Sequence, residues 1–523
     1  MAFNTRRTFA IISHPDAGKT TLTEKLLLAG GAIHMAGAVK ASGDKRRARS
    51  DWMKIEQDRG ISVTSSVMTF EHDGLVFNLL DTPGHEDFSE DTYRTLTAVD
   101  SAIMVIDAAK GIESQTLKLF EVCRLRDIPI MVLVNKVDRE GLDPFELLDE
   151  VQDTLALDLS PQVWPIGMGT EFHGVYDLAK NQYLTSSERK GGAFDKVIEC
   201  DSIMDPKLDE LVSASVLAQA RENVELALAG YSDFDRESYQ AGHLAPVVFG
   251  SALRNYGTDK LVELVGANAP EPQPRTADTR DVDPGEDNVT GFVFKVQANM
   301  DRNHRDRIAF MRVCSGHFHR GMKLRQVRTS KDIMVSSPIF FMAQDREIAD
   351  DAWPGDVIGI PNHGTIRVGD TMSEGEEFRF TGLPAFAPEI LRRVLLSDTT
   401  RVKQMRAALN DLAEEGLIQV FKPSLGANWI IGVIGVLQLD VLKARAKQEY
   451  RIDLDFEGVP YEMARWLRSD DDKLLADFIK ANSGNVVTDR DASPVFLARN
   501  AWDLDYTISK NEGIEFQKTR ELE

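Results

Sequence analysis

The sequence predicts a multidomain protein in which an α/β domain with a phosphate-binding loop comes first, an antiparallel β-barrel second and an α+β C-terminal domain third. Three observations lead to this prediction. Apolar runs alternate with helical segments over the first 270 residues or so. Short strands with turn signals follow a proline-rich linker, and helical periodicity returns from about Pro388.

The organising stretch is a loop that lies between a predicted strand at residues 9–12 and a predicted helix at residues 21–28. The loop reads Ser13-His14-Pro15-Asp16-Ala17-Gly18-Lys19-Thr20. Strand, tight Gly-Lys-Thr loop and helix are the context that a phosphate-binding loop requires. Ser13 stands where the usual pattern has Gly, and a small residue still fits there.

The last four residues of this loop have chemical roles in the prediction. Ala17 and Gly18 keep the backbone open, so that its N–H groups face the β-phosphate at the positive end of the helix. We expect Lys19 to bridge the β- and γ-phosphates and Thr20 to give its hydroxyl to Mg²⁺.

Five apolar runs indicate a mostly parallel, doubly wound sheet, because buried runs alternate with helices. They are residues 9–12, 75–80, 102–106, 130–134 and 247–249. Ligands of such sheets bind at the carboxyl ends of the strands. The residues that directly follow each run are therefore the candidate site.

The second of these runs is followed by Asp81-Thr82-Pro83-Gly84-His85. Asp81 is placed to hold Mg²⁺, directly or through water. Gly84 can offer its N–H to the γ-phosphate, because no side chain blocks the approach. His85 is the candidate catalytic residue, since its ring can position the attacking water.

Base recognition is assigned to two further loops. The first is Asn135-Lys136-Val137-Asp138, in which Asp138 can accept hydrogen bonds from guanine N1–H and N2–H₂. Asn135 is expected to contact the base edge and tie loops together, and the stem of Lys136 to pack over the ring.

The second base loop follows residues 247–249, where a backbone N–H of Ser251 or Ala252 can meet guanine O6. All four loops occur in the required order at strand ends. The sequence therefore predicts a GTP/GDP site with Mg²⁺ as cofactor.

A switch segment is expected between the first two loops, at Arg59-Gly60-Ile61-Ser62-Val63-Thr64. A hydroxyl here would complete the Mg²⁺ shell and sense the γ-phosphate, and Ser62 and Thr64 both qualify. Residues 37–49 are predicted to form a mobile switch loop. Its basic residues, Lys45, Arg46, Arg47 and Arg49, are candidates for contact with RNA phosphate.

Length, charge and cysteine content narrow the possible classes of protein. The 523 residues suggest about three domains. The net charge of −22 argues against a generic nucleic-acid coat. Cys123, Cys200 and Cys314 form no metal-binding pattern, and no apolar run is long enough for a membrane span. These features predict a cytoplasmic protein without membrane or DNA partners.

At this point the motifs resemble the translational GTPases, the ribosome-associated class that includes elongation factors Tu and G. The closer resemblance is to the bacterial peptide chain release factor 3 family. The stretches that carry it are residues 13–20, 50–53, 59–68, 84–93 and 164–169, and it extends from about residue 6 to residue 521.

This resemblance implies a P-loop GTPase domain followed by a barrel. It also implies that the protein binds the ribosome, both ribosomal RNA and ribosomal proteins, and that the ribosome stimulates GTP hydrolysis. It also implies the function: promoting the dissociation of decoding release factors after peptide release. Matching the family's Arg-Gly-Ile-Thr motif onto this chain puts the switch hydroxyl, and with it a Mg²⁺ ligand, at Ser62. The metal set is then Thr20, Ser62 and Asp81.

The predicted domains are residues 1–275 (with an insertion around 145–245), 276–385 and 386–523. The first boundary is the stiff linker at residues 270–274, followed by an acidic stretch at 276–288 that is expected to lack structure. Val402, Met405, Leu409 and Leu412 share one helix face in the last domain, and Gly416 ends that helix. Lys443, Arg445 and Lys447 are a candidate basic edge for contact with the ribosome, with a solvated helix face as the alternative.

Two alternatives remain at the level of sequence. One is a translocase of the elongation factor G kind, against which the 67 residues after Phe456 argue because they are too few for two further domains. The other is a GDP-binding scaffold without useful hydrolysis, against which Thr20, Asp81 and His85 argue.

Overall fold

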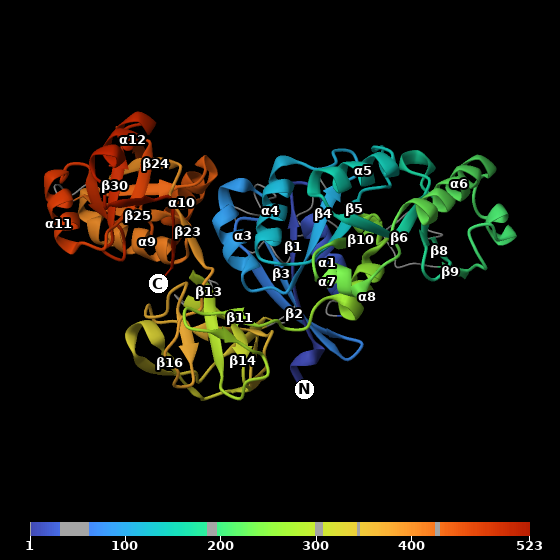
Figure 1. Ribbon diagram of the computed structural model, residues 1–523, viewed down its shortest axis with the longest axis horizontal. Coiled ribbons are helices and arrows are strands. Elements are labelled where there is room, and N and C mark those ends of the chain that lie inside the picture. The colour runs from blue at the N-terminus through green and yellow to red at the C-terminus, as the bar shows by residue number, and fades with distance from the viewer. Residues whose placement is uncertain are drawn as a thin grey trace.

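The computed structural model describes residues 2–31, 62–185, 196–298, 307–341, 346–423 and 429–522. Three units are visible in Figure 1. The nucleotide-binding fold (blue to green) lies beside the C-terminal α+β unit (orange to red), and the β-rich unit (yellow) lies below both. This arrangement confirms the predicted fold class.

Within the described residues, the first unit contains a ten-stranded mixed sheet. Its strands, in spatial order, are β2 (Ser66–His72), β3 (Leu75–Asp81), β1 (Arg6–Ser13), β4 (Ser101–Asp107), β5 (Ile130–Asn135), β10 (Leu244–Phe249), β6 (Asp158–Ile166), β7 (Gly174–Asp177), β8 (Gln182–Thr185) and β9 (Lys196–Glu199). The six strands from β3 to β6 run parallel, and all five predicted apolar runs lie among them.

Helices cover both faces of this sheet. They are α1 (Lys19–Ala29), the short η2 (Glu86–Phe88), α3 (Ser89–Leu96), α4 (Ser114–Leu125), α5 (Pro144–Leu155), α6 (Ala214–Gly230), α7 (Arg236–Gln240) and α8 (Thr258–Asn268). Successive residues of β1 point to opposite cores: Phe9 and Ile11 to one, Ala10 and Ile12 to the other. Burial on both faces is why this strand reads as a continuous apolar run.

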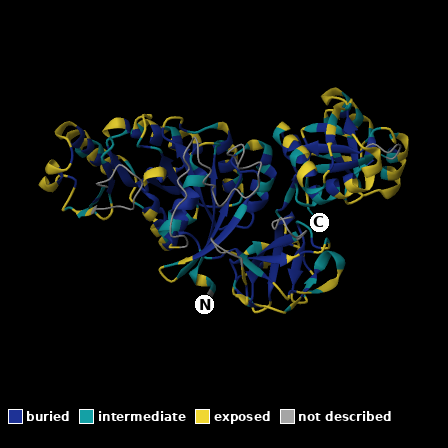
Figure 2. Ribbon diagram, turned by 180° about the vertical axis from the view of Figure 1, so that it is seen from behind, coloured by how far each residue is buried: buried dark blue, intermediate teal, exposed yellow. Residues whose placement is uncertain are grey.

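The insertion between α5 and β10 extends the sheet. β6 pairs with β10, and β7, β8 and β9 continue outward as an antiparallel edge. Helix α6 lies at one end of the molecule in Figure 1, and Figure 2 shows many exposed residues on this outer part. Residues 186–195 of the insertion lie outside the described residues.

The second unit is antiparallel throughout its described pairings, as predicted. The spatial order of its main sheet is β17 (Lys331–Met334), β16 (Lys323–Gln326), β22 (Thr371–Ser373), β13 (Thr290–Ala298), β14 (Arg307–Ser315), β21 (Val357–Pro361), β18 (Ile339–Phe341) and β19 (Arg346–Ile348). A separate ribbon pairs β15 (Phe318–His319) with β20 (Asp351–Ala352).

The expectation that residues 276–288 lack structure is wrong. β11 (Arg275–Thr276) pairs with β12 (Asp281–Val282). Arg280 holds the turn, because its guanidinium donates to Glu286 Oε1 at 2.7 Å and to Glu376 Oε2 at 2.8 Å. Acidic composition suggested a free linker, but one arginine at the right place neutralises two of the charges.

The third unit is the α+β fold predicted from residue 386 onward. Its main sheet has the order β27 (Leu454–Gly458), β24 (Ile390–Leu396), β26 (Ile430–Val433), β25 (Gln419–Pro423), β29 (Val486–Thr488), β30 (Pro494–Ala498), β28 (Met463–Arg468) and β31 (Glu515–Gln517), and β23 (Pro384–Phe386) pairs separately with β32 (Thr519–Glu521). Its helices are α9 (Val402–Glu414), α10 (Val436–Glu449), α11 (Asp472–Ala481) and α12 (Ala501–Lys510). Gly416 follows α9 with φ of 80°, which suits a glycine stop.

The predicted basic edge on α10 is wrong. Arg445 is buried and pairs with Glu415, from Nη1 to Oε2 at 2.6 Å, and with Glu449. Lys443 and Lys447 each face an aspartate, Asp455 and Asp453. The positive charges of this helix are therefore compensated within the domain. Trp466 and Phe478 pack in the cores of this domain.

A buried ion-pair cluster joins the first two units. Asp100 accepts from Arg312 Nη2 at 2.6 Å and from Arg275 Nη2 at 2.7 Å. Arg312 also donates to the carbonyl of Ala98. Because a buried arginine without its carboxylate is strongly unfavourable, this cluster fixes the barrel against the nucleotide-binding unit.

Candidate nucleotide-binding site

The carboxyl ends of neighbouring strands bring the four predicted loops to one edge of the sheet. β1 and β3 pair in parallel with Ile11 opposite Asp81, and β5 and β10 pair with Val134 opposite Phe249. The loops that follow these strands start at His14, Thr82, Lys136 and Gly250. Parallel register alone therefore gathers the candidate residues.

The phosphate loop has the backbone shape of an anion cradle. Asp16 has φ of 64° and Gly18 has φ of 102°, so N–H groups turn inward before α1 begins at Lys19. A Cβ on Gly18 would lie 2.3 Å from Nδ2 of Asn135, which excludes any other residue there. The first turn of α1 then points its N–H groups at the cradle.

Lys19 and Asp81 form the electrostatic centre of the site. Lys19 Nζ lies 2.5 Å from Asp81 Oδ1, and the side chains are 6% and 2% exposed. The other carboxylate oxygen, Oδ2, is buried without a hydrogen-bond partner among the described residues. A buried, unsatisfied carboxylate oxygen suits a hard divalent cation such as Mg²⁺.

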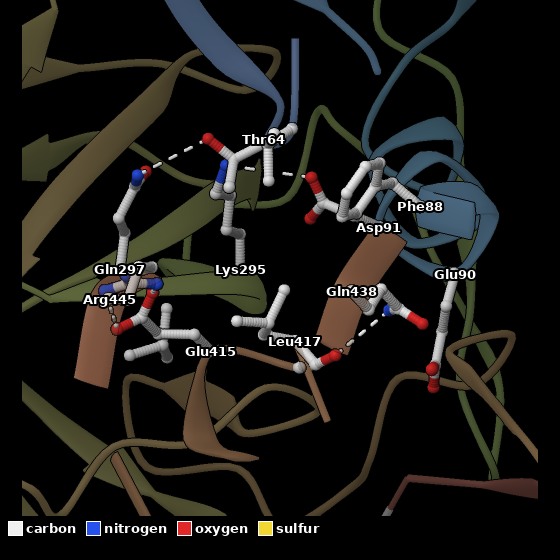
Figure 3. A pocket seen from close by; sticks show the side chains of 13 residues that line it. Thr64, Phe88, Glu90, Asp91, Lys295, Gln297, Glu415, Leu417, Gln438 and Arg445 are labelled. Atoms are coloured by element: carbon white, nitrogen blue, oxygen red, sulfur yellow. Dashed lines mark hydrogen bonds and ion pairs between the residues drawn. The ribbon is translucent and has the colours of Figure 1, made fainter. Parts of the chain in front are cut away.

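The two candidates for the switch hydroxyl lie in different surroundings. Ser62 is 9% exposed. Thr64 faces the barrel, where its Oγ1 accepts from Gln297 Nε2 of β13 at 3.5 Å (Figure 3). The predicted switch residues 37–49 and 59–61, including Lys45, Arg46, Arg47 and Arg49, lie outside the described residues.

Gly84 and His85 lie where the second loop meets the first. The Cβ position of Gly84 is 3.5 Å from Pro15 Cα, so the two loops are in van der Waals contact. His85 Nδ1 accepts from the backbone N–H of Asp87 at 3.2 Å and lies 3.3 Å from Asp87 Oδ1. Since Nδ1 is the acceptor, a neutral His85 ring carries its proton on Nε2.

The Asn135 loop is joined to the other loops by direct hydrogen bonds. Asn135 Nδ2 donates to the carbonyl of Ala17 at 2.8 Å, and Asn135 Oδ1 accepts from the N–H of Ala252 at 2.9 Å. Lys136 Nζ donates to the carbonyl of Asp16 at 2.5 Å and lies 2.7 Å from Asp107 Oδ2. These hydrogen bonds join the loop at residues 135–138 and the loop at residues 13–20 into one unit.

Asp138 is held by a partner that sequence reasoning missed. Its Oδ2 lies 3.2 Å from Arg254 Nε, and the Asp138 side chain is 6% exposed. The Ser251 N–H donates to the carbonyl of Tyr256, whereas the Ala252 N–H faces Asn135. A guanine O6 bound at this position would therefore have to share the Ala252 N–H with the side-chain oxygen Asn135 Oδ1. Val137 is buried behind the loop.

The remaining predicted residues shape the loops. Thr82 is buried and its hydroxyl donates to the Ile11 carbonyl at 2.7 Å, and Pro83 is buried beside it. His14 turns toward α4, with Nε2 3.0 Å from Glu113 Oε2. Glu113, Asp107 and Arg254 were not predicted, because ordinary charged residues in loops carry no spacing signal.

The segment after His85 contacts the C-terminal unit. Asp87 Oδ2 accepts from the N–H of Leu437, at the start of α10, at 2.7 Å. A Cβ on the preceding Gly435 would meet Asp87 Cγ at 1.9 Å, so only glycine permits this approach. Tyr93 of α3 packs on Phe386, with ring centroids 5.2 Å apart.

All three units line one pocket beside this contact (Figure 3). Its polar wall contains Asp91 from α3, Lys295 from β13 and the Glu415–Arg445 pair from the C-terminal unit. Asp91 Oδ2 also accepts from the N–H of Ser65 at 2.6 Å. Charged side chains therefore line the place where α3 and the start of β2 meet the barrel and α10.

Fold and site together define the class of protein: a guanine-nucleotide-binding P-loop GTPase. The sequence model described as "Elongation factor Tu GTP binding domain" matches residues 4–271, more than half of the chain, so the chain belongs to that family of GTPases. "Elongation factor G domain 2" matches residues 288–375, and "Class II release factor RF3, C-terminal domain" matches residues 380–508. The three matches together make it a translational GTPase of the RF3 type, which hydrolyses GTP and interacts with the ribosome.

Structural comparison agrees on the fold. A crystal structure of a protein from Thermus thermophilus aligns with a TM-score of 0.71 and 24% sequence identity, covering 87% of this chain and 68% of that one. None of the helices in the described ranges is long and apolar enough to cross a membrane.

The assignment of Asp138 predicts a change in base preference. Asp138→Asn replaces two acceptors by one donor and one acceptor, so it should favour xanthosine over guanosine nucleotides. Loss of the charge-assisted pair should cost about 2–4 kcal/mol in GTP binding. Titration of both nucleotides measures this, and unchanged GTP affinity would contradict the assignment. Arg254→Lys, which keeps the charge beside Asp138, serves as the control.

The Lys19–Asp81 centre predicts a metal dependence. Thr20→Ala should abolish the gain in GTP affinity that Mg²⁺ provides, and Lys19→Ala should abolish tight binding with or without Mg²⁺, because each substitution removes a different contact. Binding titrations in Mg²⁺ and in a chelator separate the two effects. Normal Mg²⁺-dependent binding by either variant would show that the loop does not hold the phosphates.

Proposed function

We propose that this chain is a ribosome-stimulated GTPase of translation termination, which acts in the cytoplasm and promotes the dissociation of decoding release factors after peptide release. The observation that carries the proposal is the release-factor match over residues 380–508. The unit that contains these residues also contacts the segment that follows His85, which gives it a direct connection to the nucleotide site. The same match favours a release-factor role over a translocase.

In the proposed site the phosphates lie in the loop 13–20, with Lys19 between the β- and γ-phosphates. Thr20 and Asp81 would hold Mg²⁺, with Ser62 as the switch ligand and Thr64 as its alternative. When bound, Mg²⁺ neutralises charge on the β- and γ-oxygens. Asp138 and Asn135 would read guanine, with a backbone donor at Ser251 or Ala252.

Hydrolysis in this proposal depends on how His85 is held. Water attacks the γ-phosphorus, and the bond to the β–γ bridging oxygen breaks, which leaves GDP and phosphate. His85 orients the water and Lys19 stabilises the charge that develops on the bridging oxygen. The Asp87 contact holds the His85 ring by Nδ1. Contact with the ribosome is proposed to turn the ring toward the nucleotide.

The same segment is the proposed route from nucleotide to C-terminal unit. Residues 81–96 run without interruption from Asp81 through His85 and Asp87 to α3. Loss of the γ-phosphate would release the loop around Gly84, and the contact between Asp87 and α10 would shift with it. A GTP form and a GDP form with different positions of the C-terminal unit would follow.

A release assay tests the proposed function. Ribosomes that carry a labelled decoding release factor after peptide release are mixed with the protein and GTP, and the rate of loss of the label is measured. Faster dissociation with GTP than with GDP is expected, and the Lys19→Ala variant serves as the control. If the protein left this rate unchanged while GTP was hydrolysed on the ribosomes, the chain would be a translational GTPase with another task.

The role of His85 predicts a separation of binding from chemistry. His85→Ala should leave GTP affinity nearly unchanged and slow single-turnover hydrolysis on ribosomes by about 100-fold or more, because the attacking water is misplaced. Rapid-quench measurement on ribosomes compares parent and variant. His72→Ala is the control, because His72 lies at the end of β2 remote from Asp81, and it should hydrolyse GTP like the parent. Equal rates for His85→Ala and parent would remove His85 from the mechanism.

A further inference from the structure

A two-stranded ribbon on the barrel unit brings two histidines and an aspartate together. His317 precedes β15 and His319 lies within it, two positions on, so their side chains share one face of the chain. Asp351 of β20 is the register partner of His319. The alternate residues Phe318 and Ala352 are fully buried on the other face, which fixes the direction of all three polar side chains.

The three donor atoms converge on one point. His319 Nδ1 lies 2.6 Å and His317 Nε2 lies 3.1 Å from the same oxygen, Asp351 Oδ1. The two imidazole rings are 3.8 Å apart between centroids. The side chains are 32%, 55% and 56% exposed for His317, His319 and Asp351, so an ion from solvent can reach them.

Surrounding residues hold the ribbon in place. The Trp353 ring stacks on His317, with centroids 3.7 Å apart and planes at 12°. The backbone N–H of Trp353 donates to Asp356 Oδ2 at 2.9 Å, and the buried Asp356 accepts from Asn78 Nδ2 of β3 at 3.2 Å. The ribbon is therefore anchored, through Trp353, to the nucleotide-binding unit.

The charges nearby favour ligation by neutral imidazole. Burial lowers the pKa of His317, the neighbouring His319 lowers it further, and the opposing effect of Asp351 does not offset them. The charge of Arg6 also lowers the pKa of His317, and the Arg6 guanidinium is itself paired with Asp356, with Nε 3.4 Å from Oδ2. A neutral ring with an available lone pair is the form that binds metal.

We propose that His317, His319 and Asp351 form a binding site for a divalent transition-metal ion of the Zn²⁺ class. Two imidazole nitrogens and one carboxylate suit Zn²⁺, Co²⁺ or Ni²⁺, whereas Mg²⁺ prefers oxygen ligands. Three protein ligands leave at least one position for water.

The geometry needs only a small adjustment. Ligand atoms at about 2.0–2.1 Å in a tetrahedral shell are about 3.3 Å from one another. The separation of 3.1 Å between His317 Nε2 and Asp351 Oδ1 is already close to this value, and that of 2.6 Å for His319 must open. As the metal binds, it replaces the proton between His319 Nδ1 and Asp351 Oδ1, and the neutral His319 ring then carries its single N–H proton on Nε2.

Titration of Zn²⁺ into the metal-free full-length protein tests the site. Saturating Mg²⁺ and GDP are present throughout, so that the nucleotide site is already filled. Calorimetry is expected to show one Zn²⁺ per chain, and Co²⁺ is expected to give the visible absorption of a low-coordinate nitrogen–oxygen site. His319→Ala and Asp351→Asn should each weaken binding by at least about tenfold.

His72→Ala is the matched control, because His72 Nε2 faces a single carboxylate, Asp73 Oδ2, at 3.4 Å and has no second histidine beside it in the described residues. This variant should bind Zn²⁺ like the parent. Absence of a stoichiometric Zn²⁺ site in the parent would overturn the proposal and leave a hydrogen-bonded His–Asp–His cluster. Parent-like affinity in both His319→Ala and Asp351→Asn would also overturn it.

Discussion

The buried pair of Lys19 and Asp81 is the constraint on which the nucleotide site depends. The parallel strands β1 and β3 end side by side. Asp81 is the last residue of β3, and Lys19 is the first residue of α1, which follows β1 after the loop; both side chains lie where water is excluded. A buried charge without a partner costs several kcal/mol, so each of these residues requires the other or a substitute. In the proposed site, a phosphate chain would be the negative partner of Lys19 and Mg²⁺ the positive partner of Asp81, so that guanine nucleotide with Mg²⁺ would satisfy both at once.

The same strand end connects the phosphates to the rest of the molecule. Four residues after Asp81 comes His85, and two residues later Asp87 accepts a hydrogen bond from the first turn of α10. The barrel does not need to move with this segment, because Asp100, Arg275 and Arg312 fix it to the nucleotide-binding unit. The C-terminal unit is therefore the part of the molecule best placed to follow the nucleotide.

Local chemistry decided what could be predicted from the sequence. The strands β1, β3, β4, β5 and β10 were predictable because burial on both faces leaves continuous apolar runs, and Gly18 because a Gly-Lys-Thr turn has few alternatives. The residues that form long-range ion pairs could not be predicted. Arg445 belonged to a candidate basic edge in the sequence, and only the fold brings Glu415, 30 positions away, beside it. Arg254 likewise acquires its role only when β10 lies next to β5. Long-range ion pairs of this kind carry no signal in spacing.

The central claim is that the phosphate state, read at residues 81–96, sets the position of the C-terminal unit. Energy transfer between dyes on α6 and α12, measured with GDP and with a non-hydrolysable GTP analogue, tests it most directly. The account predicts two distinct distances in the parent and a reduced difference in Asp87→Ala, which loses the contact with α10. A single distance in both nucleotide states of the parent would contradict the account.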